Sequence, residues 1–277
     1  MVMPRTERRR VSCFVATLVL TVTIPLVAPD EAIPRASSDC RVLFIGAHGL
    51  NENESSPILA DTWKSFHAYS ENHGSYGKDK PKMLAYPKLG VWEFISALRA
   101  NIENPNMSSL PAVNQGVELL DATVRGYLAQ CPYGGGVVIA GYSEGAWIVD
   151  EYLRRNYGLS AAVKGVQLYG DPLYEDLNMG DQGLGRNFGF ASNFPDPYPD
   201  STLEGANIVD SQCMNMDPIC GRGFRAADSS ARSSQQLGAA LRCAVKIDAC
   251  KSHTESYLGL TVKRGGEFLA ANSFNAD

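Results

Sequence analysis

The sequence predicts a single-domain α/β protein, a three-layer sandwich in which helices cover a central, mostly parallel sheet. One observation is the run GGGVVIAG at 134–141, which is apolar without alternation, as in a parallel strand buried on both faces. Another is that such runs alternate along the chain with segments that carry apolar residues at three- and four-residue spacing, the pattern of an amphipathic helix. No repeat or long linker divides the chain, so one domain is expected at 39–277.

The first half of that domain begins with an expected strand at 41–46, a short run of branched apolar residues followed by the turn-forming AHGLNEN. A broadly helical region and a weaker strand at 81–87 come next. Apolar residues at helical spacing then predict a helix over 110–130. They are Val113, Val117, Leu120, Val124 and Leu128.

The second half continues the alternation with the strand at 134–141, a helix ending near Gly158 and a strand at 163–172. Residues 171–204 are dense in Gly, Asp, Asn and Pro, which predicts a long loop. GANIVDSQC then restores an extended segment, and SSQQLGAALRCAV indicates a further helix.

Residues 1–38 are interpreted as a signal peptide and short leader, because RTERRR precedes an apolar run and then small and polar residues. A membrane anchor is the alternative, but the run is short and contains Pro25. The formal net charge is −5, and residues 1–28 contribute +3 from four arginines and one glutamate, so the exported protein is near −8. This acidity argues against a nucleic-acid partner. We expect a secreted monomer with no stable membrane anchor.

Six cysteines follow the leader, an even number that is typical of disulfides in an exported protein. They are Cys40, Cys131, Cys213, Cys220, Cys243 and Cys250. A zinc site would need close CxxC pairs or neighbouring histidines. Only His253, near Cys250, fits that description, so no metal is predicted.

The motif G141-Y142-S143-E144-G145 has the GxSxG pattern of a nucleophilic serine. An apolar strand precedes it and a helix follows, which is the context that exposes a serine at a sharp turn in α/β-hydrolases. The backbone N–H of Glu144 is predicted to be one oxyanion donor. The second is expected at Leu50 or its neighbours, in the loop after the first strand.

The general base is predicted by elimination among four histidines. His67 and His73 lie on or just after a predicted upstream helix. His48 lies in the proposed oxyanion loop, where we expect it to shape the loop rather than to transfer protons. His253 remains, and its position after the nucleophile fits the chain order serine, acid, histidine.

From about Cys40 to Tyr257 the chain resembles the cutinase family of secreted serine esterases. The resemblance is carried by VVIAGYSEGAWIV, FIGAHGLNE, HTESY and, most specifically, by CMNMDPIC with Asp217 between two cysteines. The family usually has Gln where Glu144 stands, and commonly a small hydroxyl residue where Leu50 stands. Leu50 therefore offers no side-chain donor.

The resemblance implies that Cys40 pairs with Cys131 and that Cys213 pairs with Cys220, which leaves Cys243 and Cys250 as an additional pair. The interval between Asp217 and His253 is longer than the family usually has. Its insertion, within 221–250, is either a helical flap over the site or a solvated decoration.

Two aspartates compete for the role of the acid. Asp171 directly follows a predicted strand, where open α/β sheets place functional groups. The resemblance favours Asp217, which a short disulfide loop would hold rigidly, and Asp217 is the acid we predict. In the GDP turn, Asp171 more commonly caps its own backbone.

These features predict a secreted carboxylic ester hydrolase with Ser143, His253 and Asp217 as a catalytic triad and no cofactor. Its expected partner is an ester substrate: a polyester, a lipid or a short-chain acyl ester. An acyl esterase on cell-envelope or polysaccharide esters is an alternative. A non-catalytic envelope or carbohydrate-binding protein on the same fold is another.

Overall fold

The computed structural model describes residues 40–50, 52, 55–74, 77–78, 80–87, 90, 93, 96, 111–132, 135–156, 162–172, 208–214, 217–220, 235, 238–243 and 250–274. All of them lie in one unit, Ala36–Asp277. The predicted leader and most of the loop predicted at 171–204 lie outside the described residues.

The described strands form one sheet in the order β2-β1-β3-β4-β5, and every neighbouring pair is parallel. The strands are β1 (Leu43–Ala47), β2 (Lys82–Met83), β3 (Val137–Tyr142), β4 (Val163–Tyr169) and β5 (Val209–Gln212). The predicted α/β class is confirmed. The weaker strand predicted at 81–87 is much shorter than expected, since it pairs through two residues of β1.

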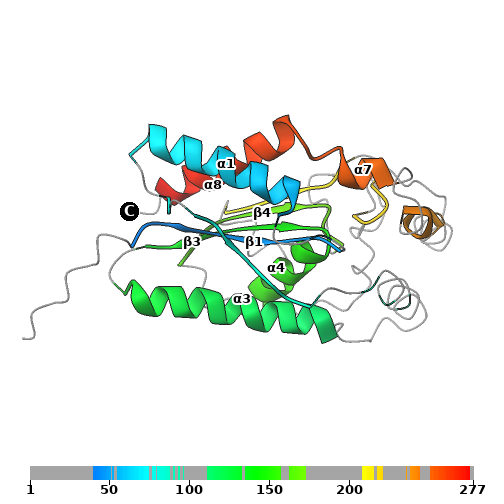
Figure 1. Cartoon of the computed structure of the whole chain (residues 1–277), viewed down its shortest axis with the longest axis horizontal. Coiled ribbons are helices and arrows are strands. Elements are labelled where there is room, and N and C mark those ends of the chain that lie inside the picture. Colours follow the sequence, from blue (N-terminus) through cyan, green and yellow to red (C-terminus); the bar gives the residue numbers. More distant parts are fainter. Residues whose placement is uncertain are drawn as a thin grey trace, which may run out of the picture. The chain divides into compact units, whose positions relative to one another are not determined.

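Helices cover both faces of this sheet, with α1 and α8 on one side and α3 and α4 on the other (Figure 1). Their bounds are α1 (Pro57–Asn72), α3 (Pro111–Gln130), α4 (Glu144–Arg155) and α8 (Leu260–Phe274). The central strand β3 is buried along its whole length. Val137 and Ile139 belong to the core beneath α3 and α4, whereas Val138 and Ala140 belong to the core beneath α1 and α8. A strand covered on both faces therefore needs the unalternating apolar run seen in the sequence.

Helix α8 was not predicted from the sequence. Two adjacent glycines, Gly265 and Gly266, lower helix propensity in its middle. The structure shows why they are there: a Cβ at Gly265 would overlap the hydroxyl of Tyr169, and one at Gly266 would lie 2.7 Å from the Phe66 nitrogen of α1. The glycines let α8 approach both the sheet and α1 closely.

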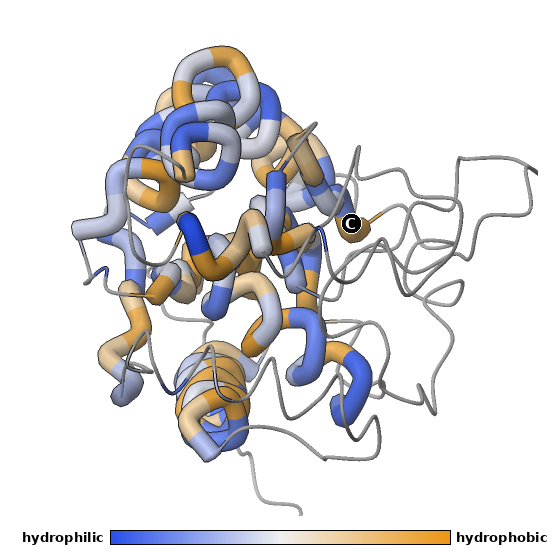
Figure 2. Tube along the Cα trace, turned by 90° about the vertical axis from the view of Figure 1, so that its right-hand side faces the viewer, coloured by the Kyte–Doolittle hydropathy of each residue, from blue (hydrophilic) through white to orange (hydrophobic). Residues whose placement is uncertain are grey.

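The helices have the mixed surfaces that such layers require, with hydrophobic and hydrophilic residues alternating around their turns (Figure 2). A short helix, α7 (Lys251–Thr254), lies near the edge of the sheet where the strands end (Figure 1). None of the described helices is both long enough and apolar enough to span a membrane.

Candidate active site

The residues of interest gather at one edge of the sheet. Because the strands are parallel, their carboxyl ends meet there, and open α/β sheets place functional groups at this edge. Ser143 directly follows β3, and the predicted oxyanion loop at 48–50 directly follows β1. Gly170 follows β4, and the segment that leads to Asp217 follows β5.

Ser143 occupies a strained turn between β3 and α4. Its φ is 56° and its ψ is −117°. Among the described residues, Ser143 is the one non-glycine residue with a positive φ. Such a conformation costs roughly 1–3 kcal/mol and persists only where the surroundings enforce it. The Ser143 N–H donates to the Tyr169 carbonyl at 2.9 Å, and its own carbonyl accepts the Trp147 N–H at 3.2 Å. The serine is thus fixed between the end of β4 and the first turn of α4.

The two motif glycines make this turn sterically feasible. A Cβ at Gly145 would overlap the carbonyl of Ala47 and lie 2.7 Å from the carbonyl oxygen of His48. A Cβ at Gly141 would lie 2.7 Å from the Cα of Ala146. All of these are backbone atoms, which cannot rotate out of the way. The end of β1 can therefore press directly against the start of α4.

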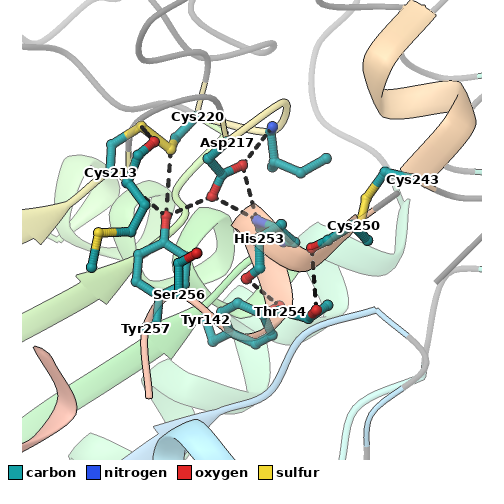
Figure 3. A network of polar contacts seen from close by, with 12 residues as sticks. Tyr142, Cys213, Asp217, Cys220, Cys243, Cys250, His253, Thr254, Ser256 and Tyr257 are labelled. Carbon is teal, nitrogen blue, oxygen red and sulfur yellow. Dashed lines mark hydrogen bonds and ion pairs between the residues drawn. A yellow bond between two sulfur atoms is a disulfide. The ribbon is translucent and has the colours of Figure 1, made fainter. Parts of the chain in front are cut away.

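His253, on α7, forms a buried pair with Asp217. Its Nδ1 lies 2.8 Å and 3.0 Å from the two carboxylate oxygens (Figure 3). The same carboxylate accepts the Ile219 N–H at 2.8 Å and the Tyr257 hydroxyl at 2.6 Å. An ionised carboxylate only accepts, so this contact places the imidazole proton on Nδ1 and leaves Nε2 as the basic nitrogen. Nε2 is buried and has no hydrogen-bond partner among the described residues.

The surroundings fix the imidazole of His253 from two sides. The Tyr142 ring stacks on it with a centroid distance of 5.1 Å, and the Tyr142 hydroxyl donates to the His253 carbonyl at 2.9 Å. On another side lies Gly170, where a Cβ would come within 2.6 Å of the imidazole Cε1. Gly170 follows Tyr169, whose carbonyl binds Ser143, so the serine and the histidine share the end of β4.

Three disulfides join the six cysteines: Cys40–Cys131, Cys213–Cys220 and Cys243–Cys250. These are the pairs that the sequence resemblance and the cysteine count implied. Cys213 and Cys220 enclose Asp217 in a short loop. Cys250 is the residue before α7, so its bond to Cys243 connects the 221–250 insertion to the helix that carries His253.

The described part of that insertion is packed into the protein. Residues 238–243 are helical, as predicted, and Ala240 is buried in the same core cluster as Ile219. This helix is therefore more than a solvated decoration. Most of the remaining insertion lies outside the described residues.

Asp171, the competing acid, has a different partner. It is buried, and its carboxyl hydrogen-bonds to Asp150 of α4. Burial raises the pKa of Asp150, while Arg154, with Nε 3.0 Å from Asp150 Oδ1, opposes that rise. Of the two aspartates, Asp217 is the one that the structure places against His253.

Of the two residues predicted to supply oxyanion donors, Glu144 follows Ser143 directly and Leu50 lies in the loop after β1. Glu144 is the first residue of α4, where backbone N–H groups point out of the helix end. In the loop after β1, Gly49 lies so close that a Cβ there would be 3.2 Å from Ser143 Cβ. Leu50 follows and is partly buried against the core.

No role was predicted from the sequence for Tyr142, Gly170 or Tyr257, which surround the histidine and the acid. For Tyr257 a signal existed, since it stands four residues after His253, about one helical turn away. His67 and His73, which were not predicted as the base, lie on α1 or directly after it. His67 faces Glu71, and His73 stacks on Tyr69.

A sequence model of the Cutinase family matches residues 99–242, more than half of the chain and a segment that includes Ser143 and Asp217. A solved structure of a cutinase-like protein from Cryptococcus sp. is 15% identical, with a TM-score of 0.45 over 86% of this chain and 98% of that one. Among curated proteins, none matches. The extent of the family match shows that this chain belongs to the cutinase family.

Proposed function

We propose that the protein is a serine carboxylic ester hydrolase in which Ser143 is the nucleophile, His253 the general base and Asp217 the orienting acid. Membership of the cutinase family supports ester hydrolysis. The observation that carries the residue assignment is the arrangement at one sheet edge: a serine in a strained turn shares the end of β4 with a buried histidine–aspartate pair.

The chemistry follows from the proton positions. Ser143 Oγ attacks the ester carbonyl carbon while Nε2 of His253 takes the hydroxyl proton. The tetrahedral intermediate collapses, and the leaving alcohol takes that proton from the imidazolium, which leaves an acyl-serine. Water then repeats the two steps and releases the acid. Asp217 stabilises the imidazolium and holds its orientation throughout.

The developing oxyanion requires fixed donors. We propose the backbone N–H groups of Glu144 and Leu50 for this role; Glu144 begins α4, and Gly49, the residue before Leu50, lies against Ser143. The positive end of the α4 dipole adds to the stabilisation. The partly buried side chain of Leu50 is apolar, so its contribution comes from the backbone alone.

We further propose that residues 1–38 form a leader that is removed on export, and that 39–277 act as one extracellular domain on an ester substrate. Three disulfides support an oxidising compartment. The proposed substrate is an ester: a polyester, a lipid or a short-chain acyl ester.

The direct test is Ser143→Ala, assayed with p-nitrophenyl butyrate. The loss of a triad nucleophile should lower kcat at least about a thousandfold while the melting temperature stays close to that of the wild type. In the wild type, an organophosphonate should label Ser143, as peptide mass mapping would show. If Ser143→Ala retained near-normal turnover, the proposed function would be wrong.

A chain-length series of p-nitrophenyl esters separates the substrate classes. Rising kcat/KM from acetate to longer chains would favour lipid or polyester substrates. A sharp preference for acetate would favour acyl esters of polysaccharides.

A further inference from the structure

The loop after β1 holds a peptide unit by both of its polar ends. In the peptide between His48 and Gly49, the carbonyl accepts a hydrogen bond from the Tyr86 hydroxyl. The N–H of the same unit donates to the Glu52 carboxylate, with 3.1 Å between Gly49 N and Oε2. A peptide unit is planar, so fixing both ends fixes its rotation.

The next peptide unit is held through its carbonyl. The Gly49 carbonyl accepts the Glu52 N–H at 3.2 Å and lies 3.1 Å from His48 Nδ1. A carbonyl only accepts, so this histidine nitrogen donates. In a trans peptide the N–H points away from the carbonyl, and here that N–H belongs to Leu50. No hydrogen bond from the Leu50 N–H to another described residue is present.

Tyr86 is suited to act as a permanent donor. Burial raises the pKa of its phenol well above 10, and the negative charges of Glu144 and Glu52 raise it further. The phenol therefore keeps its proton throughout the working range of an esterase. Its ring stacks on His48 with a centroid distance of 4.4 Å, so ring and hydroxyl hold the same residue.

We propose that Glu52 and Tyr86 are positioning residues that preorganise the Leu50 N–H as an oxyanion donor. Neither touches the substrate. Their side chains fix the His48–Gly49 peptide plane, which adjoins the plane that carries the Leu50 N–H in the loop beside Ser143, so the donor needs no reorganisation when charge develops on the substrate oxygen. This proposal rests on the proposed function and deepens it, since it assigns the rigidity of the oxyanion site to two side chains.

The test compares Glu52→Ala with Glu52→Gln, using kcat and KM for p-nitrophenyl butyrate and the Ki of an alkyl boronic acid. Glu52→Ala frees the Gly49 N–H and should lower kcat about tenfold to a hundredfold with little change in KM, because the lost stabilisation exists only in the transition state. The boronic acid forms a tetrahedral adduct, so its Ki should rise in parallel. Glu52→Gln keeps an acceptor oxygen and should recover most of the loss.

Glu93→Ala is a matched control. The Gly90 N–H donates to Glu93 Oε2 at 2.9 Å, which is the same contact three residues apart, here between exposed residues. Its loss should leave kcat and the boronic acid Ki unchanged. Tyr86→Phe should lower kcat about tenfold, because it frees the other end of the His48–Gly49 peptide. The double variant should lose less than the product of the two single losses, since either change releases the same unit.

Three results would overturn the proposal while leaving the esterase assignment intact, provided that Ser143→Ala is inactive. One is a Glu52→Ala protein with lower thermal stability but a kcat within twofold of the wild type. Another is a Glu52→Gln protein as impaired as Glu52→Ala. A third is full activity in Tyr86→Phe, a variant mild enough to decide the matter if Glu52→Ala does not fold.

Discussion

The two sides of the proposed site are built by different means. On the nucleophile side, backbone meets backbone: Ser143 is forced into positive φ, and Gly145 lies against the carbonyl of Ala47. On the acid–base side, side chains and cross-links hold short segments: Asp217 accepts from three donors inside a disulfide loop, and His253 rests against Tyr142.

Because of this difference, the two sides should respond differently to amino-acid substitutions. A backbone contact leaves no freedom to relax, so one added methyl group should disable the nucleophile side and strain the fold together. The Asp217 carboxylate has several hydrogen-bond donors, and a single substitution removes only one of them. The acid–base side should therefore respond in graded steps, with activity falling before stability.

Gly145→Ala should have the largest combined effect. The new methyl group would overlap the Ala47 carbonyl, which should lower the free energy of unfolding by about 3 kcal/mol or more. A displacement of Ser143 should also lower kcat at least about a hundredfold. Gly126→Ala, on the exposed surface of α3 with no atom within 4 Å of the new Cβ, is the control and should gain about 0.5–1 kcal/mol. Urea titration of both variants checks this. Equal stabilities would contradict it.

On the other side, Asp217→Asn should lower kcat roughly 10³- to 10⁴-fold through the wrong histidine tautomer. Its stability should change much less than its activity. Asp171→Asn alters a contact with Asp150 and leaves the Asp217–His253 pair in place, so it should shift the melting temperature while kcat stays within about threefold. A folded but inactive Asp171→Asn, with Asp217→Asn near normal, would transfer the role of acid to Asp171.

The disulfides should separate activity from stability. Removal of Cys213–Cys220 by paired Ser substitutions should lower kcat below the melting temperature, because the Asp217 loop is released. Cys40–Cys131 closes a loop of 91 residues, and such a bond stabilises by about 4.7 kcal/mol, so its removal should mainly lower the melting temperature. Kinetics at 20 °C and calorimetry on both variants check this. A loss of activity confined to the Cys40–Cys131 variant would contradict it.

The sequence predicted the nucleophile side better than the acid–base side, for a physical reason. Ser143 and its glycines are adjacent in the chain, so strand, sharp turn and helix can be read from one local motif. Asp217 and His253 are 36 residues apart and come together only in the fold. The position of each aspartate in the sequence did not decide whether Asp171 or Asp217 is the acid. The resemblance to a family favoured Asp217.

Partners that depend on close packing were harder to predict. Gly170 has no motif of its own, and Tyr257 offered only its spacing after His253; each contributes through the position that the fold gives it. Helix α8 was missed for the same reason. Gly265 and Gly266 lower its helix propensity, yet its packing against α1 and the sheet requires them.

The smallest effect is expected at Tyr257. Tyr257→Phe removes one of three donors to Asp217 and should lower kcat about threefold to tenfold. Tyr152→Phe is the matched control, because the buried Tyr152 hydroxyl has no hydrogen-bond partner among the described residues. It should leave kcat unchanged. Steady-state kinetics at pH 8 compare the two, and equal activities would remove Tyr257 from the acid's support.

The same variant predicts a pH effect of known sign. Burial, reinforced by the charge of Asp217, raises the pKa of Tyr257 well above its usual value. Above about pH 10 the unfolded phenol ionises while the folded one stays neutral, so its contribution to stability is complete below that pH and declines as the pH rises. Tyr257→Phe should therefore lose less stability between pH 9 and about pH 11. Urea titrations at both pH values would show it, and an equally steep decline would mean that Tyr257 ionises freely in the folded protein.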